Sequence, residues 1–562
     1  GVLADFFRRY EEARIAFSKD KMQIIGFTTA RERGRGRKDV VFPDVVLDCP
    51  DMPHWHQHRV VVQRELEMLG FVLDRKLSWT AHVKRAVEKA RVLLARLQVC
   101  VRLKWGLRPR VVTQLWKGAV EPVLLNGVGV WAAALKRKGV VRALRGVQRI
   151  AALAKTRCFK TTSTAAALAL AQFPPVDLVA QEAVILQYCH GTLRGDQEVL
   201  KGDCRWSKRF TYVKGVLQDA GIVLGDVEYE RRLHDFELPY PPYRKVLDIS
   251  LGSREGWAED RLTGLDAETG VIFTDGSKIP GQGVGAAFVA MDKDGVVQAS
   301  GKFKLPDFST NYQAEAVGMR GGLEWVEEDE GRKAKKWLVM TDGLAVLSAM
   351  QGGSRMTPLV AQVVDKAREG ISFVYIPAHK GHAGNEKADE LAKAAVEEGV
   401  RVEVQVPRGY TKGLARERTW RLWAAEWEAM RAEDEAKGEG ERRRTYLEFA
   451  PSLEDLKAGV WDKKVDARVL QLVSGHCNLG EYLHRFGRRE TPECALCGVE
   501  AETVAHYLLR CRRWDRERNE IMDLVKRDDE TASLRGLLQE VDRLARFVKR
   551  TGRLEIRGRG EG

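Results

Sequence analysis

The most informative pattern along the chain is an apolar run that ends in a carboxylate, and it occurs twice. Residues 271–274 are apolar or β-branched and lead directly into Asp275 and a Gly-Ser turn. Residues 337–341 repeat the pattern and lead into Asp342. A short apolar run bounded by turn residues predicts a buried strand. Both carboxylates are therefore expected at strand ends, where the chain leaves the core.

From about residue 270 the pattern predicts strand, strand, strand, helix, strand, helix, helix, strand, helix. An Asp-Gly turn between residues 284–290 and 296–303 is a strong hairpin signal, so the first three strands should be antiparallel. A helix from about 310 to 330 and a later crossover to 372–376 complete the region. We expect a mixed five-stranded α/β sheet with flanking helices.

Upstream of this region, apolar positions recur with helical spacing. A helix is predicted from about residue 80 to 101, with an apolar stripe and lysines and arginines elsewhere. A second is predicted from about 109 to 130 and a third over 144–154. This part of the chain is expected to be mostly helical.

A third helical region is expected after about residue 406, and it carries three tryptophans. Trp420, Trp423 and Trp427 fall on one helical face, ahead of a charged run over 431–444. Such a stripe is typical of a packing seam, which we favour over a base-stacking platform.

The charge balance narrows the class of partner. Formal net charge is +14 with a pI near 9.3, which favours a polyanion such as nucleic acid over a merely soluble basic protein. Hydrophobic residues make up 44% and charged residues 31%, and no run is long and apolar enough for a transmembrane helix. The nine cysteines include five scattered between Cys49 and Cys204 without metal spacing, so a reduced compartment, nuclear or cytoplasmic and not secreted, is expected.

Four carboxylates share a chemical logic. Asp275 and Asp342 end strands, Glu315 lies in the first turns of the helix that starts near residue 310, and Asp389 lies early in the last helix. Singly they read as a turn residue, a solvated helical acid or an acid that stabilises a helix dipole. Together, and in this order, they predict a metal site, because hard cations prefer carboxylate oxygens.

A second ligand set lies near the C-terminus. Cys494 and Cys497 form a Cys-x-x-Cys pair, and His506 and Cys511 follow on a predicted helix. Four such ligands fit Zn²⁺. The alternatives are free core cysteines, or competition from Cys477 or His484, which lack the paired spacing.

The carboxylate segments resemble the type-1 ribonuclease H family. The matching pieces are Thr-Asp-Gly-Ser at 274–277, the helical glutamate, Thr-Asp-Gly at 341–343 and a histidine before Gly-Asn-Glu-x-Ala-Asp at 384–389. The resemblance implies a nuclease that cuts the RNA strand of RNA–DNA hybrids with two Mg²⁺ or Mn²⁺ ions. It implies a proton-shuttling role for His379 and substrate contacts for Ser277 and Asn311, although Asn311 also reads as a helix cap.

Two departures from that family are visible. A small hydroxyl residue usually follows the third aspartate, whereas this chain has Gly343, which bears on fine positioning rather than on the ligand. Between Asp342 and Ser372 there is no basic helix and loop of the kind that grips substrate in some members. Affinity for a hybrid would then come from flanking segments.

Other segments resemble the reverse transcriptases of non-LTR retrotransposons. They are Leu-Gly-x-x-Leu-Asp at 69–74 with Leu-x-Trp at 77–79, 120–127, 147–149, 161–164 ahead of 174–178, and 475–487 with the Cys-x-x-Cys pair. The resemblance implies a polymerase remnant followed by the nuclease and a nucleic-acid-binding zinc knuckle. The polymerase box Tyr-x-Asp-Asp is not in this sequence and is expected upstream of Gly1.

Basic residues gather again near the end of the chain, where they form either a solvated face or, as the nearby Cys-x-x-Cys pair leads us to favour, a phosphate-facing side. They are Arg512, Arg513, Arg516, Arg518, Arg543, Arg546, Lys549, Arg550 and Arg553.

The expected organisation is a palm remnant (1–60), a helical thumb and connection region (61–245), a linker (246–268), the ribonuclease H domain (269–400), a helical linker (401–460) and a zinc-knuckle tail (461–562). We expect an RNA–DNA hybrid ribonuclease that binds hybrids and element RNA without a membrane partner. The alternative is a non-catalytic nucleic-acid-binding remnant of a decayed element.

Overall fold

The computed structural model describes residues 23–27, 43–47, 58–102, 108–191, 208–222, 227–230, 247–251, 266, 269–352, 356–377, 382–438, 442–457, 460, 465–522 and 534–554. The chain divides into two compact units: unit 1 joins 1–183 with 418–562, and unit 2 is 184–417. Unit 1 therefore contains segments from both the first and the last third of the chain.

Unit 2 is built on one mixed sheet in the order β13-β10-β9-β8-β11-β12-β7. The strands are β7 (Asp248–Ser250), β8 (Gly270–Ile279), β9 (Gly283–Met291), β10 (Val297–Leu305), β11 (Trp337–Thr341), β12 (Ile371–Tyr375) and β13 (Val400–Arg401). β8, β9 and β10 are antiparallel neighbours, whereas β11, β12 and β7 run parallel to β8. The predicted five-stranded α/β fold is confirmed, and two short edge strands, β7 and β13, extend the sheet to seven strands.

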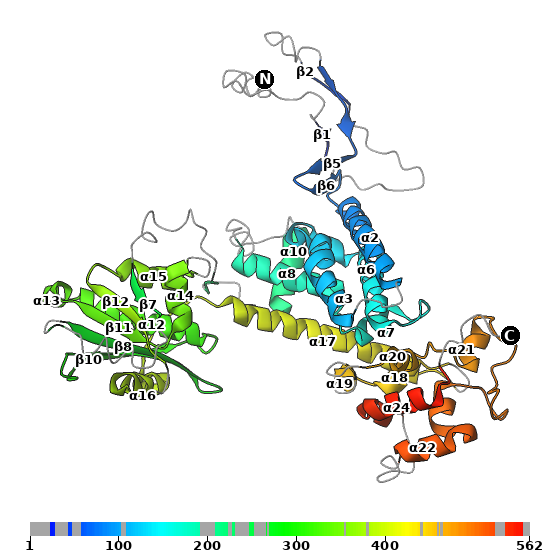
Figure 1. Cartoon of the computed structure of the whole chain (residues 1–562). Coiled ribbons are helices and arrows are strands. Elements are labelled where there is room, and N and C mark those ends of the chain that lie inside the picture. The colour runs from blue at the N-terminus through cyan, green and yellow to red at the C-terminus, as the bar shows by residue number, and fades with distance from the viewer. Residues whose placement is uncertain are drawn as a thin grey trace. The chain divides into compact units, whose positions relative to one another are not determined.

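Helices cover both faces of the sheet. They are α12 (Asn311–Glu327), α13 (Glu330–Ala334), α14 (Leu344–Gly352), α15 (Pro358–Lys366) and α16 (Ala383–Glu398). Ile272 and Phe288 pack with α12, α14 and α15 on one face, whereas Val271 and Phe273 pack with α16 on the other (Figure 1). Alternate strand residues point to opposite faces, so nearly every side chain of β8 and β9 is buried. The short α13 was not predicted.

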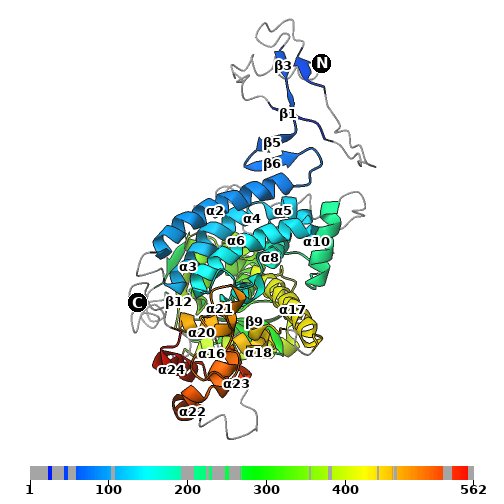
Figure 2. The same cartoon turned by 90° about the vertical axis from the view of Figure 1, so that its right-hand side faces the viewer.

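The first part of unit 1 is mostly helical, as expected. It begins with six short strands: β1 (Ile24–Ile25), β2 (Val45–Leu47), β3 (His58–Val60), β4 (Val62–Gln63), β5 (Glu65–Met68) and β6 (Phe71–Asp74). The helices that follow are α2 (Thr80–Arg102), α3 (Pro109–Leu115), the π-helix η2 (Trp116–Val120), α4 (Glu121–Leu125), α5 (Val128–Trp131), the 3₁₀ turn η3 (Ala132–Lys136), α6 (Lys138–Thr156), α7 (Thr164–Leu170) and α8 (Val176–His190). α2 and α3 lie beside α6 (Figure 2), and α7 also packs against α6.

One helix prediction here is wrong. The segment from 109 to 130 is not a single helix, because the chain leaves helical geometry at Asn126 and turns through Gly127, whose φ is +58°. A Cβ atom at Gly127 would lie 2.2 Å from the Phe71 ring, so glycine is required on both counts.

The turn after β6 shows what one of the retrotransposon-like segments does. The carboxylate of Asp74 accepts hydrogen bonds from the backbone N–H groups of Lys76, Ser78 and Trp79 at 3.1, 2.9 and 2.7 Å. Leu77 and Trp79 both adopt positive φ in this turn. The aspartate therefore holds a strained turn that starts α2.

The last part of the chain completes unit 1. Its helices are α17 (Arg408–Glu435), α18 (Thr445–Phe449), α19 (Leu453–Leu456), α20 (Ala467–Val473), α21 (Gly480–Arg485), the π-helix η6 (His506–Arg510), the 3₁₀ turn η7 (Arg512–Trp514), α22 (Asp515–Met522), α23 (Leu534–Gln539) and α24 (Val541–Thr551). One hydrophobic core runs from Ala166 and Leu170 through Trp423 and Trp427 to the C-terminal helices. The predicted packing role of the tryptophans is confirmed, and Trp427 Nε1 donates to Ala450 O at 3.0 Å.

Among the described helices, none alone has the length and apolar character to cross a membrane. The pair Pro109–Leu125 and Val128–Lys136 meets that description jointly, with a 48° bend between its parts.

Candidate metal centres

Asp275 and Asp342 follow equivalent positions on two neighbouring parallel strands. Thr274 of β8 pairs with Thr341 of β11, and each threonine is followed directly by its aspartate. β11 ends at Thr341, as expected, whereas β8 continues through Asp275 to Ile279, so the predicted strand end and turn at Asp275 are wrong. The register between the two strands still places both carboxylates at the same level. Asp275 is 7% exposed, and its Oδ1 accepts from the Gly276 N–H at 2.8 Å.

Glu315 reaches this edge from α12, which lies directly against β8. The helix starts with a capping box made by Thr310 and Gln313, so the cap is Thr310 and not Asn311. A Cβ atom at Gly276 would lie 2.5 Å from the Glu315 backbone nitrogen. Only glycine at 276 lets the helix come this close. Asn311 Nδ2 donates to Glu315 Oε1 at 2.9 Å, one helical turn away.

Asp389 comes from α16. Gly384, in the first turn, allows the helix to contact the Phe273 ring, since a Cβ atom there would lie 2.2 Å from it. Lys393 Nζ donates to Asp389 Oδ2 at 2.7 Å across one helical turn. His379, the expected proton carrier, lies outside the described residues.

The charges of the four carboxylates interact with one another. Burial first, and then the charge of Asp342, raises the pKa of Asp275 to about 7, with Asp389 and Glu315 adding to the effect. Burial and Asp342 likewise raise the pKa of Glu315 to about 7, although the hydrogen bond from Asn311 opposes this. Carboxylates that repel one another at close range are suited to binding a cation, because its positive charge offsets their repulsion.

The glycine that departs from the family pattern has a steric explanation. A Cβ atom at Gly343 would lie 2.8 Å from Glu315 Oε2 and 3.1 Å from Thr341 Oγ1. The Gly343 N–H donates to Thr341 Oγ1 at 3.0 Å. In this chain, glycine at 343 therefore leaves room for the Glu315 carboxylate.

Ser277, an expected substrate contact, lies on β8 opposite Gly285 and is half-buried. The next residue, Lys278, directs its Nζ back to the chain and donates to Ser309 O at 2.7 Å. These residues extend the strand beyond the carboxylates, along the side of the sheet where α12 begins.

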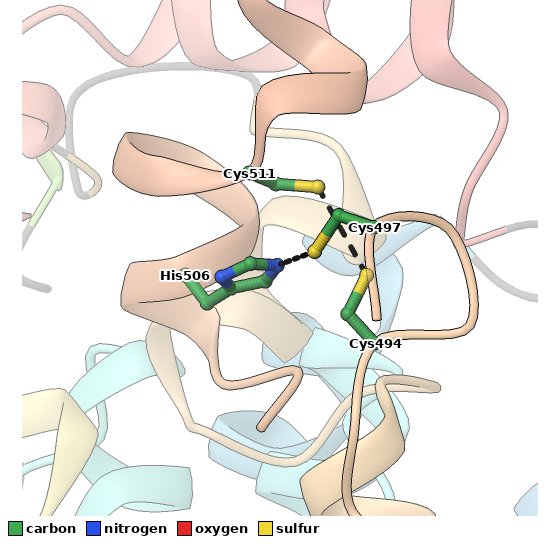
Figure 3. Close-up of side chains that lie close together, drawn as sticks. All are labelled: Cys494, Cys497, His506 and Cys511. Atoms are coloured by element: carbon green, nitrogen blue, oxygen red, sulfur yellow. Dashed lines mark hydrogen bonds between the residues drawn. The ribbon is translucent and has the colours of Figure 1, made fainter. Parts of the chain in front are cut away.

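The cysteine and histidine set converges closely. The ligand atoms of Cys494, Cys497, His506 and Cys511 all lie within 4.8 Å of one another (Figure 3), which no other His, Cys, Asp or Glu group among the described residues achieves. The sulfurs of Cys494 and Cys511 are 3.9 Å apart, and Cys497 Sγ is 3.4 Å from His506 Nε2. A tetrahedral Zn²⁺ with Zn–S bonds near 2.3 Å separates two sulfurs by about 3.8 Å, so the donor set fits this ion.

The histidine of this set is oriented by a carboxylate. His506 Nδ1 lies 2.8 Å from Glu500 Oε1, which leaves Nε2 facing the sulfurs. Metal-bound histidines commonly have such a partner on the other ring nitrogen. Gly498, at φ +68°, follows Cys497 and closes the turn that carries the first two cysteines, since its N–H donates to Cys494 O at 2.8 Å. Cys477 and His484 are not members of the cluster.

Part of the basic tail is internal, contrary to a purely phosphate-facing or solvated reading. Arg518 is 8% exposed and donates to Leu508 O and Cys511 O at 3.0 and 2.6 Å. Arg553 donates to the buried Glu502, at 2.7 Å through Nε. These arginines stabilise the cysteine region from within.

Sequence reasoning missed several residues of these sites. Lys393 could have been found, because a lysine four residues after an aspartate on a helix pairs with it. Glu500 and the close approach at Gly276 left no periodic signal, since each depends on tertiary packing.

Comparison with known proteins finds similarity in parts of the chain. Residues 267–397 match the model of the RNase H family. A putative 115 kDa protein in the type-1 retrotransposable element R1DM of Drosophila melanogaster is 26% identical over 118 residues, 21% of this chain and 12% of that protein. A retrovirus-related Pol polyprotein from the type-1 retrotransposable element R1 of Popillia japonica is 26% identical over 218 residues, 38% of this chain and 81% of that protein.

Among solved structures, LC11-RNase H1, isolated from compost by a metagenomic approach, is 23% identical, covers 23% of this chain and 97% of its own, and gives a TM-score of 0.21.

Proposed function

Because residues 267–397 form an RNase H domain in a chain related to type-1 retrotransposon polyproteins, we propose that the chain hydrolyses the RNA strand of RNA–DNA hybrids. Asp275, Glu315, Asp342 and Asp389 would hold two Mg²⁺ or Mn²⁺ ions. The observation that carries the proposal is geometric: the strand register sets Asp275 level with Asp342, and Glu315 packs against β8 at Gly276.

The protein's own groups have separate tasks in this mechanism. The bound ions would supply an activated water and charge neutralisation at the leaving oxygen. Asp275, on a rigid and buried strand, sets the position of the site, and Glu315 is held through Asn311. Ser277 and Asn311 lie beside the carboxylates where the hybrid backbone would pass. His379 would carry a proton to or from the departing strand.

Lys393 has a defined place in the proposal. Its ion pair with Asp389 neutralises one carboxylate before the cation arrives. Lys393 would leave that oxygen where Asp389 holds a metal ion. The lysine is 54% exposed on its side chain and can swing into solvent when this happens.

We also assign Zn²⁺ to the Cys494, Cys497, His506 and Cys511 cluster, as a closed structural site with four protein ligands. The knuckle would order the C-terminal part of unit 1, in which Cys494 and Cys511 belong to the hydrophobic core. Element RNA is the expected partner of this region.

Cleavage of a hybrid labelled on its RNA strand tests the nuclease proposal. Purified chain with Mg²⁺ should shorten the RNA, spare the DNA strand and leave duplex RNA intact. Asp342→Asn should abolish cleavage, while Glu390→Gln, an exposed carboxylate next to Asp389 that pairs with Lys387 at 2.8 Å, should keep it. A folded, zinc-loaded chain that binds hybrid without cutting it would instead support the non-catalytic binding role.

A further inference from the structure

Two segments singled out in the sequence, 161–164 and 475–487, meet in unit 1 although they are some 300 residues apart. Thr161 Oγ1 lies 2.9 Å from the Tyr482 hydroxyl and 2.9 Å from His476 Nδ1. Gln471 Nε2 donates to Arg157 O at 2.9 Å and fastens the two segments nearby. The nuclease proposal gives no role to this junction.

The junction presents a set of rings, called here the aromatic cluster: Phe159, His476, Tyr482 and Phe486. Tyr482 is the central ring, with centroids 4.8 Å from Phe486, 5.5 Å from Phe159 and 5.6 Å from His476. Tyr482 is buried at 6% exposure, whereas Phe486 is 42% exposed. A buried ring thus supports an exposed one.

Positive charge surrounds the aromatic cluster. The Arg485 guanidinium lies 4.7 Å from the Phe486 centroid and 5.4 Å from that of Tyr482. Its Nε and one terminal nitrogen are buried without a hydrogen-bond partner among the described residues. Lys160 and Arg488, exposed on the two segments, have no ion pair within the described part of the chain.

His476 contributes as a neutral ring. Burial first, and then the charges of Arg442 and Arg149, lower the pKa of His476 to about 4. Arg149 itself is held by the Lys160 and Thr162 carbonyl oxygens. Of the acidic groups nearby, Glu481 is engaged by Arg442 at 3.2 Å. The cluster is therefore aromatic and cationic rather than charge-balanced.

The supporting helix is held in place from the opposite side. The Gly480 N–H, at the start of α21, donates to Glu502 Oε2 at 2.7 Å. Glu502 is 1% exposed and also accepts a hydrogen bond from Arg553 Nε. Tyr482, the central ring, therefore lies on a helix that is fixed both to the cysteine region and to the 161–164 segment.

We propose that the aromatic cluster is a binding site for single-stranded nucleic acid, where an unpaired base stacks on Phe486 and phosphates meet Lys160, Arg485 and Arg488. Stacking on a ring face requires a base that is free of its partner strand, and every base has such a face. A duplex would present its edges and backbone instead. This role is separate from hybrid cleavage, which depends on the carboxylates of unit 2.

The test measures binding of labelled oligonucleotides of about 12 nucleotides, a length within the range of known single-strand sites, to the full zinc-loaded chain without added Mg²⁺. Four probes carry the same label: single-stranded RNA, single-stranded DNA, an abasic strand of equal phosphate number, and a DNA duplex. Phe486→Ala and Phe486→Trp are compared with the native chain. Tyr410→Ala is the matched control, because Tyr410 is an aromatic of similar exposure, 44%, in unit 2.

Phe486→Ala should weaken binding of the base-containing single strands by about fivefold to 100-fold, the range for loss of one stacked base. It should leave the abasic strand and the duplex unaffected, and Phe486→Trp should bind the single strands at least as tightly as the native chain. The RNA and DNA arms show which strand is preferred. Unchanged single-strand affinity in Phe486→Ala, an equal loss for the abasic strand, or an equal loss in Tyr410→Ala would overturn the proposal.

Discussion

Replacement of Asp342 by asparagine should make the Mg²⁺-free chain more stable around β8 while it removes cleavage. The side chain keeps its shape and loses its charge. Asp275 is 7% exposed, and Asp342 is the largest source of charge repulsion that acts on it. Asp342 acts on Glu315 in the same way.

The magnitude follows from the pKa of Asp275. A rise of the pKa from 3.8 to about 7 corresponds to roughly 4 kcal/mol of unfavourable free energy for the ionised form in the folded state, because one pKa unit corresponds to about 1.4 kcal/mol. Burial is the first cause and Asp342 the second. We therefore expect Asp342→Asn to raise the free energy of unfolding of the metal-free chain by about 1–2 kcal/mol at pH 8, which is part of the cost of ionising Asp275 in the folded state.

The sign of the pH dependence is determined by the same numbers. Because the folded-state pKa of Asp275 lies above 3.8, the folded chain binds more protons than the unfolded chain between about pH 4 and pH 7. Stability of the metal-free site is then fully present at low pH and is lost as the pH rises toward 7. The gain from Asp342→Asn should be large at pH 8 and nearly absent at pH 5.

Hydrogen exchange of the full-length chain provides the local readout. The amides of β8 and of α12 report opening of this region, and Mg²⁺-free buffer is preferable to a chelator, which would also remove zinc. Glu390→Gln serves as the control, with no expected change. Reduced protection in Asp342→Asn at pH 8, or an equal gain at pH 5 and pH 8, would refute the electrostatic reasoning.

Three further predictions concern single residues. Gly343→Ala should displace the Glu315 carboxylate and lower the rate of hybrid cleavage about 10- to 100-fold with little change in the melting temperature; unaltered kcat would contradict the steric argument. Lys393→Ala should lower the Mg²⁺ concentration for half-maximal cleavage by about two- to fivefold, the worth of an exposed ion pair, and a higher requirement would show that the lysine assists the metal instead. Cys497→Ser should lose bound zinc and lower the melting temperature of unit 1, whereas Cys477→Ala should keep one zinc per chain by elemental analysis; zinc loss in both variants would place Cys477 among the ligands.

The carboxylate residues could be predicted from local sequence, although the strand end expected at Asp275 is wrong, because β8 continues to Ile279. An apolar run followed by aspartate marks both Asp275 and Asp342, and the observed register places them at one level. Glu315 can lie near these aspartates because residue 276 is a glycine, and the requirement for glycine appears only once α12 contacts β8. Sequence pattern therefore gave the residues and the strands, while the close approach came from packing.

The parts that escaped prediction share a physical cause. β7 and β13 are three and two residues long, too short for alternation to be seen, and they form because the sheet has open edges to pair with. The break at Asn126 and Gly127 was hidden inside an apolar run, although an Asn-Gly pair is a turn signal. The common core of residues 166–170 with residues 446–554 leaves no local trace at all.

Only part of the basic composition is exposed and able to contact a phosphate, because other basic residues bond within the protein. Several arginines of the C-terminal tail are used internally, as Arg518 and Arg553 show. By contrast, Lys160 and Arg488 remain exposed beside an exposed aromatic ring, far from any carboxylate of the proposed nuclease site in sequence. Hydrolysis and single-strand binding are thus assigned to residues of different compact units. A chain with Asp342→Asn should keep single-strand binding in full, and its loss there would mean that the two activities use one surface.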